Sequence, residues 1–307
     1  MARRAQAGVA AITAVLVVAV AASAAAVMLA QQSALLNQAA LIAARAQADL
    51  HARAGLDWAR GILAEDARAG GVDSLADRWA QPIAGLPVDR ALVSGRLTDE
   101  QGRFNLNNVV RGNERSQPDI QILRRLLEGL ALAPDLAEAI VDWIDFDADL
   151  AGPAGAEDAY YLALARPYRA ANQAMVQVEE LHRVRGFDAK AVARLKPFVT
   201  ALPARTPVNA NTAAPEVLAA ILPELGPEEV RSLVASRAGR PFRSRDDLRE
   251  RARKAAPNAI ASDLDVGSAW FSAQVLVQQD EVELATEALI RRGANAATAI
   301  IWRRPLY

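Results

Sequence analysis

The sequence predicts an α+β fold in which a long N-terminal helix packs on an antiparallel sheet, with a large all-α domain inserted. Three observations support this fold. No charge, glycine or proline interrupts the apolar run from Val9 to Ala30, and helix-forming residues continue to Ala54. Apolar residues recur at helical spacing through the middle of the chain, and they alternate with polar residues near its end.

Composition narrows the classes of function. The 307 residues, 52% hydrophobic and 23% charged, allow about two domains with ordinary cores. A net charge of −1 gives no overall field that would attract nucleic acid or an acidic surface. The chain has no cysteine, which excludes disulfides, zinc–cysteine sites and thiol catalysis. His51 and His182 lie far apart in sequence, so a histidine metal site would need other ligand types.

The N-terminal segment allows three interpretations. Its 22 residues Val9–Ala30 would span about 33 Å as a helix, enough to cross a bilayer. It could be a single-span anchor, or a secretory signal peptide cut in the alanine-rich stretch Ala21–Ala26. It could also follow a short basic leader that ends in Gly8 and is cut before Val9.

Residues 55–110 predict the end of the long helix, an irregular segment and two short strands. We expect the helix to continue over Gly55–Ala69 and to stop at Gly70-Gly71. Trp79–Val93 is rich in proline and glycine and predicts irregular structure. Ser94–Val110 predicts two short strands about a turn at Asp99–Gly102.

The middle of the chain predicts helices. Ile120, Leu123, Leu127 and Leu130 lie at helical spacing, and Pro134 opens another helix. Two later segments each predict a helix, a tight turn at glycine and a second helix. These segments are Met175–Leu202 and Pro207–Leu248.

The C-terminal segment predicts a three-stranded antiparallel meander. Its period-two stretches are separated by turns near Gln279-Asp280 and Gly293–Asn295. Three strands need a covering layer, and the amphipathic end of the N-terminal helix is the natural candidate.

An acidic segment is the strongest local signal for chemistry. Four aspartates fall within eight residues and two more acidic residues follow a Gly/Pro turn: Asp142, Asp145, Asp147, Asp149, Glu157 and Asp158. The first spacings resemble those of an EF-hand, but Leu150 stands where that loop needs glycine, and Glu157 falls one position late. Carboxylate oxygens on a loop suit calcium, and so many like charges would repel without a counter-ion. The alternative is a solvated acidic loop or a set of helix caps.

A DNA-binding function is the alternative for the chain as a whole. The segment 208–248 resembles the helix-hairpin-helix domain of DNA-uptake receptors, which are also tethered by an N-terminal helix. Such hairpins bind phosphate through backbone N–H groups of a glycine-bearing turn. Here the turn Leu225–Glu229 has only Gly226, Pro227 lacks an N–H, and two glutamates follow. Nucleic acid is therefore disfavoured.

Catalytic motifs are absent from the sequence. It contains no G-x-S-x-G, P-loop or H-E-x-x-H pattern. We predict a protein that is not an enzyme; a secreted hydrolase would require the mature chain to begin after Ala26.

Five segments, in order along the chain, resemble one family. They are GVAAITAVLVVAVA, DEQGRFNLNNVV, DWIDFDADLAGPAGAEDAYYLALARPYRAANQAM, VEELHRVRGF and TPVNANTAAPEVLAAI. These resemble the minor pseudopilin K family of the bacterial type II secretion system, also called general secretion pathway protein K. The resemblance covers nearly the whole chain.

The resemblance implies a domain organisation. Residues 1–8 would be a leader, and residues 9–55 a transmembrane and filament helix. Residues 56–113 and 265–307 would form a pilin-like α/β body, and residues 114–264 an inserted helical domain with helix-hairpin-helix-like segments.

It also implies processing and location. The prepilin peptidase would cut between Gly8 and Val9, and the new N-terminus would be methylated. The protein would cross the inner membrane once, with its body in the periplasm. Most pilins carry glutamate at the fifth mature position, where this chain has Thr13. In pilins this glutamate meets the amino terminus of a neighbouring subunit. A subunit at the top of the filament has no subunit above it, so the resemblance is compatible with threonine at this position.

Finally, the resemblance implies partners and a cofactor. The family assembles with the minor pseudopilins I and J at the pseudopilus tip, initiating or capping assembly with other pseudopilins and supporting export of folded proteins across the outer membrane. Calcium is reported for the family, and the resemblance implies that the six acidic residues from Asp142 to Asp158 would bind it.

Overall fold

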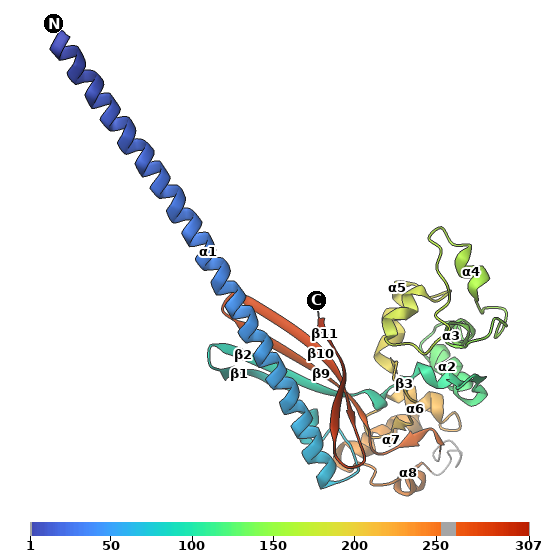
Figure 1. The fold of residues 1–307 in the computed structure, drawn as a ribbon. Helices are drawn as coiled ribbons and strands as arrows, with labels where there is room; N and C mark the ends of the chain where they lie inside the picture. The colour runs from blue at the N-terminus through green and yellow to red at the C-terminus, as the bar shows by residue number, and fades with distance from the viewer. Residues whose placement is uncertain (1, 253–261, 307) are drawn as a thin grey trace.

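The computed structural model describes residues 2–252 and 262–306, and only the backbone of residues 2–9. One helix dominates it, α1 (Ala2–Ala69), whose N-terminal half stands clear of the body (Figure 1). Within the described part, α1 from Ala10 onward is the one helix long and apolar enough to cross a membrane. The predicted stop at Gly70-Gly71 is confirmed.

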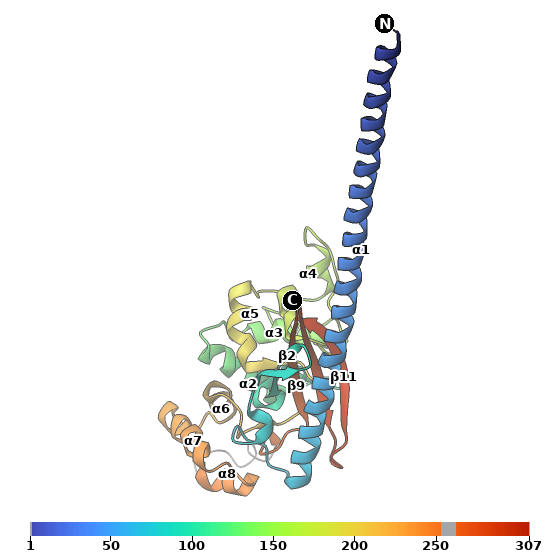
Figure 2. The same ribbon diagram turned by 90° about the vertical axis from the view of Figure 1, so that its left-hand side faces the viewer.

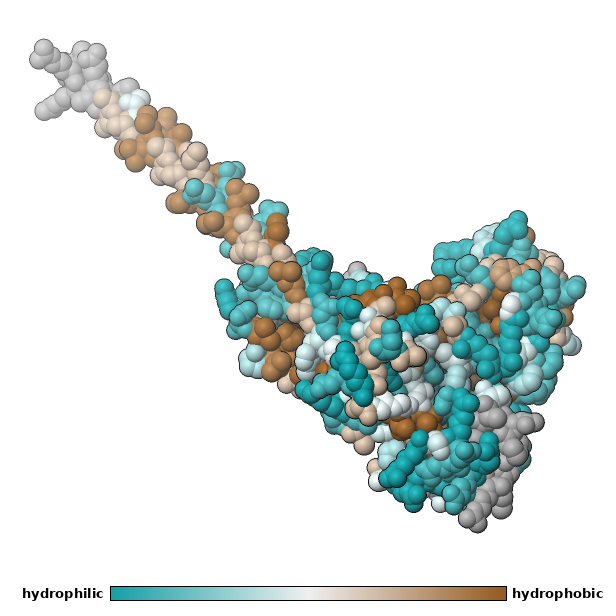
Figure 3. All heavy atoms as spheres, turned by 60° about the horizontal axis from the view of Figure 1, so that its bottom comes forward, coloured by the Kyte–Doolittle hydropathy of each residue, from teal (hydrophilic) through white to brown (hydrophobic). Residues whose placement is uncertain are grey.

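The free half of α1, residues 10–43, exposes its apolar side chains. Ile12 is 70% exposed and Leu29 64%. Figure 3 shows hydrophobic residues along this half, whereas the face of the body in that view is mostly hydrophilic. Burial of side chains begins near Ala48, where α1 meets the sheet.

The sheet has five antiparallel strands in the order β1-β2-β9-β10-β11. The predicted C-terminal meander is confirmed as its last three strands. The bounds of the five are β1 Ile83–Val88, β2 Ala91–Asp99, β9 Trp270–Gln279, β10 Val282–Arg292 and β11 Thr298–Leu306.

Of two expectations about the segment before the helical block, one is wrong and the other is correct in part. Residues 79–93 are not irregular, because they contain β1 and the start of β2. The segment 94–110 does have strand residues on both sides of the turn at 100–102, but these two strands do not pair with each other. Instead β2 pairs with β9, and β3 (Phe104–Asn105) pairs in parallel with β6 (Val199–Thr200).

The lower half of α1 packs on one face of the sheet. Gly55 allows the close approach, because a Cβ there would lie 3.0 Å from Cγ1 of Val275 on β9. The core between them includes Leu56, Leu63 and Phe271, all at most 1% exposed. The buried positions on α1 recur every three or four residues, as expected for one face of a helix.

The helical block lies on the other side of the strands from α1 in Figure 1, and Figure 2 shows its last helices beside the C-terminal end of α1. Its α-helices are α2 Gln117–Gly129, α3 Leu136–Ile144, α4 Asp158–Leu162, α5 Ala189–Leu195, α6 Pro215–Ile221, α7 Pro227–Gly239 and α8 Arg245–Arg251. Short 3₁₀ helices are found at 78–80, 100–102, 106–109, 178–183 and 196–198.

The helix-turn-helix prediction is correct only in part. In the second segment, α6 and α7 flank a turn at Gly226. In the first, the element before Gly186 is the 3₁₀ helix Val178–Arg183, and an α-helix, α5, follows.

Short strands and buried polar groups join the block to the sheet. β7 (Val208–Asn209) pairs in parallel with β8 (Leu264–Asp265), which comes shortly before β9. β4 (Val110–Arg111) and β5 (Glu114–Arg115) form a separate hairpin. The Asn209 side chain donates to Oδ2 of Asp99 at the end of β2 over 2.9 Å, and to Oγ of Ser268 before β9 over 3.0 Å.

The hydrophobic core of the block draws residues from Phe104 to Val266. A separate core lies between α1 and the sheet. The domain boundaries at 113/114 and 264/265 stay predictions.

Candidate metal centre

Three of the predicted acidic residues converge where α3 ends. Asp142 lies in the last turn of α3, Asp145 follows the helix directly, and Glu157 immediately precedes α4. One carboxylate oxygen from each lies within 4.8 Å of the other two. All three side chains are buried, at 0%, 1% and 7% exposure.

Two glycines let the intervening loop fold over these carboxylates. A Cβ at Gly155 would collide with Oδ2 of Asp142, and one at Gly152 would collide with the carboxylate of Glu138. The loop is also fixed by a hydrogen bond of 2.7 Å, in which the backbone N–H of Ala151 donates to Oδ1 of Asp142.

Arg115, at the end of β5, is the cation nearest the cluster. Its Nε donates to Oδ2 of Asp145 over 2.8 Å, and its Nη2 donates to Oδ1 of Asp147 over 3.1 Å. The same Nη2 lies 3.7 Å from Oδ1 of Asp142. One guanidinium cannot neutralise four neighbouring carboxylates, so the site keeps an excess of negative charge.

Three carboxylate oxygens at the centre of the site have no hydrogen-bond partner among the described residues: Oδ2 of Asp142, Oδ1 of Asp145 and Oε1 of Glu157. Leaving a buried acceptor unsatisfied costs about 1–3 kcal/mol. Calcium binds six to eight oxygens at about 2.3–2.6 Å, so two of its ligands lie at most about 5 Å apart. The three residues therefore fit a calcium ion in donor type and spacing.

The electrostatics agree with a site that needs a cation. Burial, with a further contribution from the charge of Asp142, raises the pKa of Glu157 to about 7. Burial raises the pKa of Asp142 to about 6. It also raises the pKa of Asp145, against the opposing effect of Arg115. A bound divalent cation would favour the charged form of each group.

The other three predicted ligands lie outside this convergence. The Asp147 side chain is about half exposed, at 49%, and its Oδ1 accepts from the backbone of Asp149 over 2.8 Å. Asp149 itself is exposed. Asp158 turns to Arg169, whose Nη1 donates to its Oδ2 over 2.8 Å.

Sequence reasoning missed two residues of this site. Glu138 precedes Asp142 by one helical turn, so the helix period could have placed it on the same face. Its Oε2 accepts from the backbone of Ala154 over 2.9 Å. Arg115 lies 27 residues before Asp142, and no local pattern connects the two.

The residues of the predicted leader junction lie on α1. Gly8 and Val9 have helical backbone, and the side chain of Val9 lies outside the described part of the chain. Thr13 is exposed, and its Oγ1 donates to the backbone oxygen of Ala10 over 2.9 Å.

The turn considered for DNA binding is already occupied. The backbone N–H of Gly226 donates to Oε2 of Glu229 over 2.9 Å and caps α7. Because Pro227 has no N–H, the start of α7 presents carboxylates where a phosphate would need donors.

Models of one family match the central part of the chain. They are described as "Type II secretion system (T2SS), protein K", and they match residues 102–204 and 208–267. The type II secretion system protein K of Pseudomonas aeruginosa is 33% identical to this chain, over 98% of the chain and 93% of the relative. That of Klebsiella pneumoniae is 34% identical over 76% of each.

A solved structure shares the fold. It is the crystal structure of the GspK-GspI-GspJ complex from the type 2 secretion system of enterotoxigenic Escherichia coli. A chain in it matches 85% of this chain and 96% of its own length, with a TM-score of 0.76 and 25% identity. With the identity over 98% of the chain to the Pseudomonas relative, this makes the chain a member of the type II secretion system protein K family.

Proposed function

We propose that the chain is a minor pseudopilin that forms the tip of the type II secretion pseudopilus together with the minor pseudopilins I and J. In this role it initiates and caps assembly with other pseudopilins, and it supports export of folded proteins across the outer membrane. The role is structural and non-enzymatic.

The single observation that carries this proposal is the position of the helical block. The free half of α1 offers an apolar surface for packing among the helices of a filament. At the opposite end, the segment that joins α7 to α8 lies beside the C-terminal end of α1 (Figures 1 and 2). A further subunit added to the filament beyond this end of α1 would have to occupy the space that this segment and its two helices fill.

The N-terminal segment supports the proposal that the subunit is anchored in the inner membrane before it joins the filament. We infer that the prepilin peptidase cuts between Gly8 and Val9 and that Val9 is then methylated. α1 from Ala10 is long enough to span the bilayer once, which would leave the body in the periplasm. Replacing Gly8 by a bulky residue should leave residues 1–8 on the mature protein, and an unchanged mature mass would exclude this junction.

Calcium is the cofactor that we propose for the acidic site. Asp142, Asp145 and Glu157 would hold it, with Asp147 at the exposed edge. The ion would supply the positive charge that Arg115 alone does not, and it would tie the loop before α4 to the end of α3. The three unpartnered oxygens support this assignment.

Co-purification tests the partnership. The tagged full chain would be extracted in mild detergent from the inner membranes of a strain that produces its own minor pseudopilins I and J. We expect both to co-purify with it. A control strain that produces the tagged chain without its secretion partners should yield the chain alone. Recovery of neither partner from the complete strain would contradict the proposal.

A further inference from the structure

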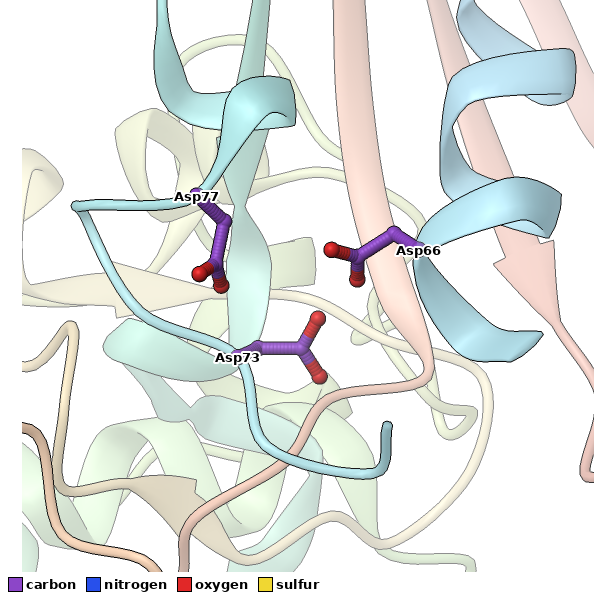
Figure 4. A group of neighbouring side chains, drawn as sticks. All are labelled: Asp66, Asp73 and Asp77. Carbon is purple, nitrogen blue, oxygen red and sulfur yellow. The ribbon is translucent and has the colours of Figure 1, made fainter. Parts of the chain in front are cut away.

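A second group of carboxylates converges at the joint between α1 and the sheet. Asp66 lies in the last turn of α1, Asp73 lies in the loop after it, and Asp77 precedes the 3₁₀ helix Arg78–Ala80. Figure 4 shows the three side chains pointing into a common space. An oxygen from each lies within 4.8 Å of the other two.

Arg292 is hydrogen-bonded to this group. Arg240 and Arg243 line the pocket beside Asp66 and Asp77, and among the described residues neither forms an ion pair with these two carboxylates. Nη1 of Arg292, at the end of β10, donates to Oδ2 of Asp66 over 2.8 Å, and its Nη2 donates to Oδ2 of Asp73. The Nη2 of Arg292 also donates to the backbone oxygen of Ser268 over 2.7 Å. Arg292 therefore neutralises one of three carboxylate charges.

An unpartnered oxygen marks the centre of the group. Asp73 is 0% exposed, and its Oδ1 has no hydrogen-bond partner among the described residues. Its Oδ2, in contrast, accepts from the backbone of Ser268 over 2.7 Å. Asp77 is held toward the same space by Ser74, whose backbone N–H donates to it over 2.6 Å. A buried acceptor without a partner, beside two further carboxylates, is an environment that a cation satisfies.

We propose that Asp66, Asp73 and Asp77 bind a divalent cation of the calcium type, in a site separate from the acidic site at Asp142. Two positive charges would balance the two carboxylates that Arg292 leaves uncompensated. The oxygens have the spacing that one ion of about 2.4 Å metal–oxygen distance requires, and water would complete the coordination.

Such an ion would join the filament helix to the rest of the body. Asp66 belongs to α1, whereas the backbone N–H of Asp73 donates to the carbonyl oxygen of Val266 over 2.9 Å. Asn209 donates to the backbone oxygen of Asp73 over 3.1 Å. The cation would therefore fix the end of α1 against the segment that connects the helical block to β9.

The competing explanation is a proton shared between Asp66 and Asp73. Burial and the charge of Asp73 raise the pKa of Asp66 to about 6, so a protonated Asp66 is available near that pH. A shared proton would satisfy Asp66 and Asp73, while both oxygens of Asp77 accept from Ser74, and it predicts no dependence on calcium.

The test counts calcium ions on the purified full chain in detergent, by equilibrium dialysis after chelator treatment. The variants are Glu157→Gln for the acidic site, Asp77→Asn for this one, and the double variant. Asp280→Asn is the matched control, because Asp280 lies in an exposed turn, ion-paired with Arg90, where its positive φ suits asparagine.

We expect Asp77→Asn to lose one ion per chain, or to weaken that ion's binding at least tenfold, while Asp280→Asn binds as the wild type does. The Glu157→Gln chain should keep one ion that raises its thermal midpoint, and the double variant should keep none. Unchanged binding by folded Asp77→Asn, or no calcium on Glu157→Gln, would overturn the proposal. If Asp77→Asn does not fold, the Glu157→Gln measurement decides alone. If Asp77→Asn loses an ion and Glu157→Gln binds as the wild type does, the calcium assignment at Asp142, Asp145 and Glu157 is wrong. The site at Asp66, Asp73 and Asp77 is then supported.

Discussion

Nε of Arg115 donates to Oδ2 of Asp145 over 2.8 Å, across two elements 30 residues apart in sequence. This contact attaches the acidic loop to the β4–β5 hairpin. It leaves Oδ1 of Asp145 buried and unpartnered. The arginine therefore positions the loop while keeping one oxygen of Asp145 available for a cation.

Replacing Arg115 by alanine should destabilise the metal-free protein. The change leaves a buried acceptor of Asp145 unsatisfied, and we expect the free energy of unfolding in chelator to fall by about 1–3 kcal/mol. Added calcium should then stabilise Arg115→Ala more than the wild type, because the ion becomes the main counter-charge. Chemical denaturation with and without calcium measures both effects. Arg90→Ala, which breaks an exposed ion pair, should change the free energy of unfolding by less than about 0.5 kcal/mol. Equal behaviour of the two variants would contradict the assignment.

Adjacent residues provide a matched pair for the acidic site. Glu157→Gln removes one of the three converging carboxylates and should reduce the rise in thermal midpoint that calcium gives the wild type. In chelator the same change should raise the midpoint, because it removes a buried charge beside Asp142 and Asp145. Asp158→Asn changes a carboxylate that binds Arg169 instead, and it should keep the full calcium response. A larger loss with Asp158→Asn than with Glu157→Gln would mean that the wrong residue has been assigned.

Stability should depend on pH in a direction set by Glu157. Its pKa is raised from 4.5 to about 7, so the native state holds this proton more tightly than the unfolded state does. In chelator, its contribution to stability is therefore complete below about pH 4.5 and is lost as pH rises to about 7. Each unit of raised pKa corresponds to about 1.4 kcal/mol.

Comparison with Glu157→Gln separates this contribution from that of the distant Asp66, whose pKa is also raised to about 6. The contribution includes the coupled titration of Asp142. The free energies of unfolding of the two proteins, measured from pH 4.5 to 8 in chelator, should diverge as pH rises, with the wild type becoming the less stable. Parallel curves would contradict the raised pKa.

The loop glycine at the acidic site gives a test of packing. Gly155→Ala places a Cβ against Oδ2 of Asp142, and we expect a loss of about 1–3 kcal/mol in the free energy of unfolding. Gly61→Ala is the control, because nothing lies within 4 Å of a Cβ at that position on α1, where alanine should stabilise the helix by about 0.5–1 kcal/mol. Thermal unfolding of the two variants should shift in opposite directions. A tolerated Gly155→Ala would show that the loop does not close over the carboxylates as described.

The sequence predicted those strands that are buried on one face only, because their apolar and polar residues alternate. β9 lies between β2 and β10, with one face covered by α1, so its apolar and polar residues alternate. β1 is an edge strand with four consecutive exposed residues and with Pro87 within it, so no alternation marked it. Its pairing depends on β2, which pairs in turn with a strand about 180 residues later in the chain.

The candidate sites were predictable only where the ligands are local. Asp142, Asp145 and Glu157 come from one short segment, and composition alone marked it. Composition could not separate Glu157 from Asp158, because the start of α4 directs neighbouring side chains to different partners. The group at Asp66, Asp73 and Asp77 gave no signal, since three aspartates spread over a helix end and a loop are ordinary in sequence. Only the fold brings Arg292 to them.

The most direct test of the central claim locates this protein on assembled pseudopili. Pseudopili sheared from cells that overproduce the major pseudopilin would be labelled with gold against an epitope in the helical block and examined by electron microscopy. We expect label at one end of each filament, and no label on filaments from a strain lacking the chain. Label distributed along the filament length would contradict a tip subunit.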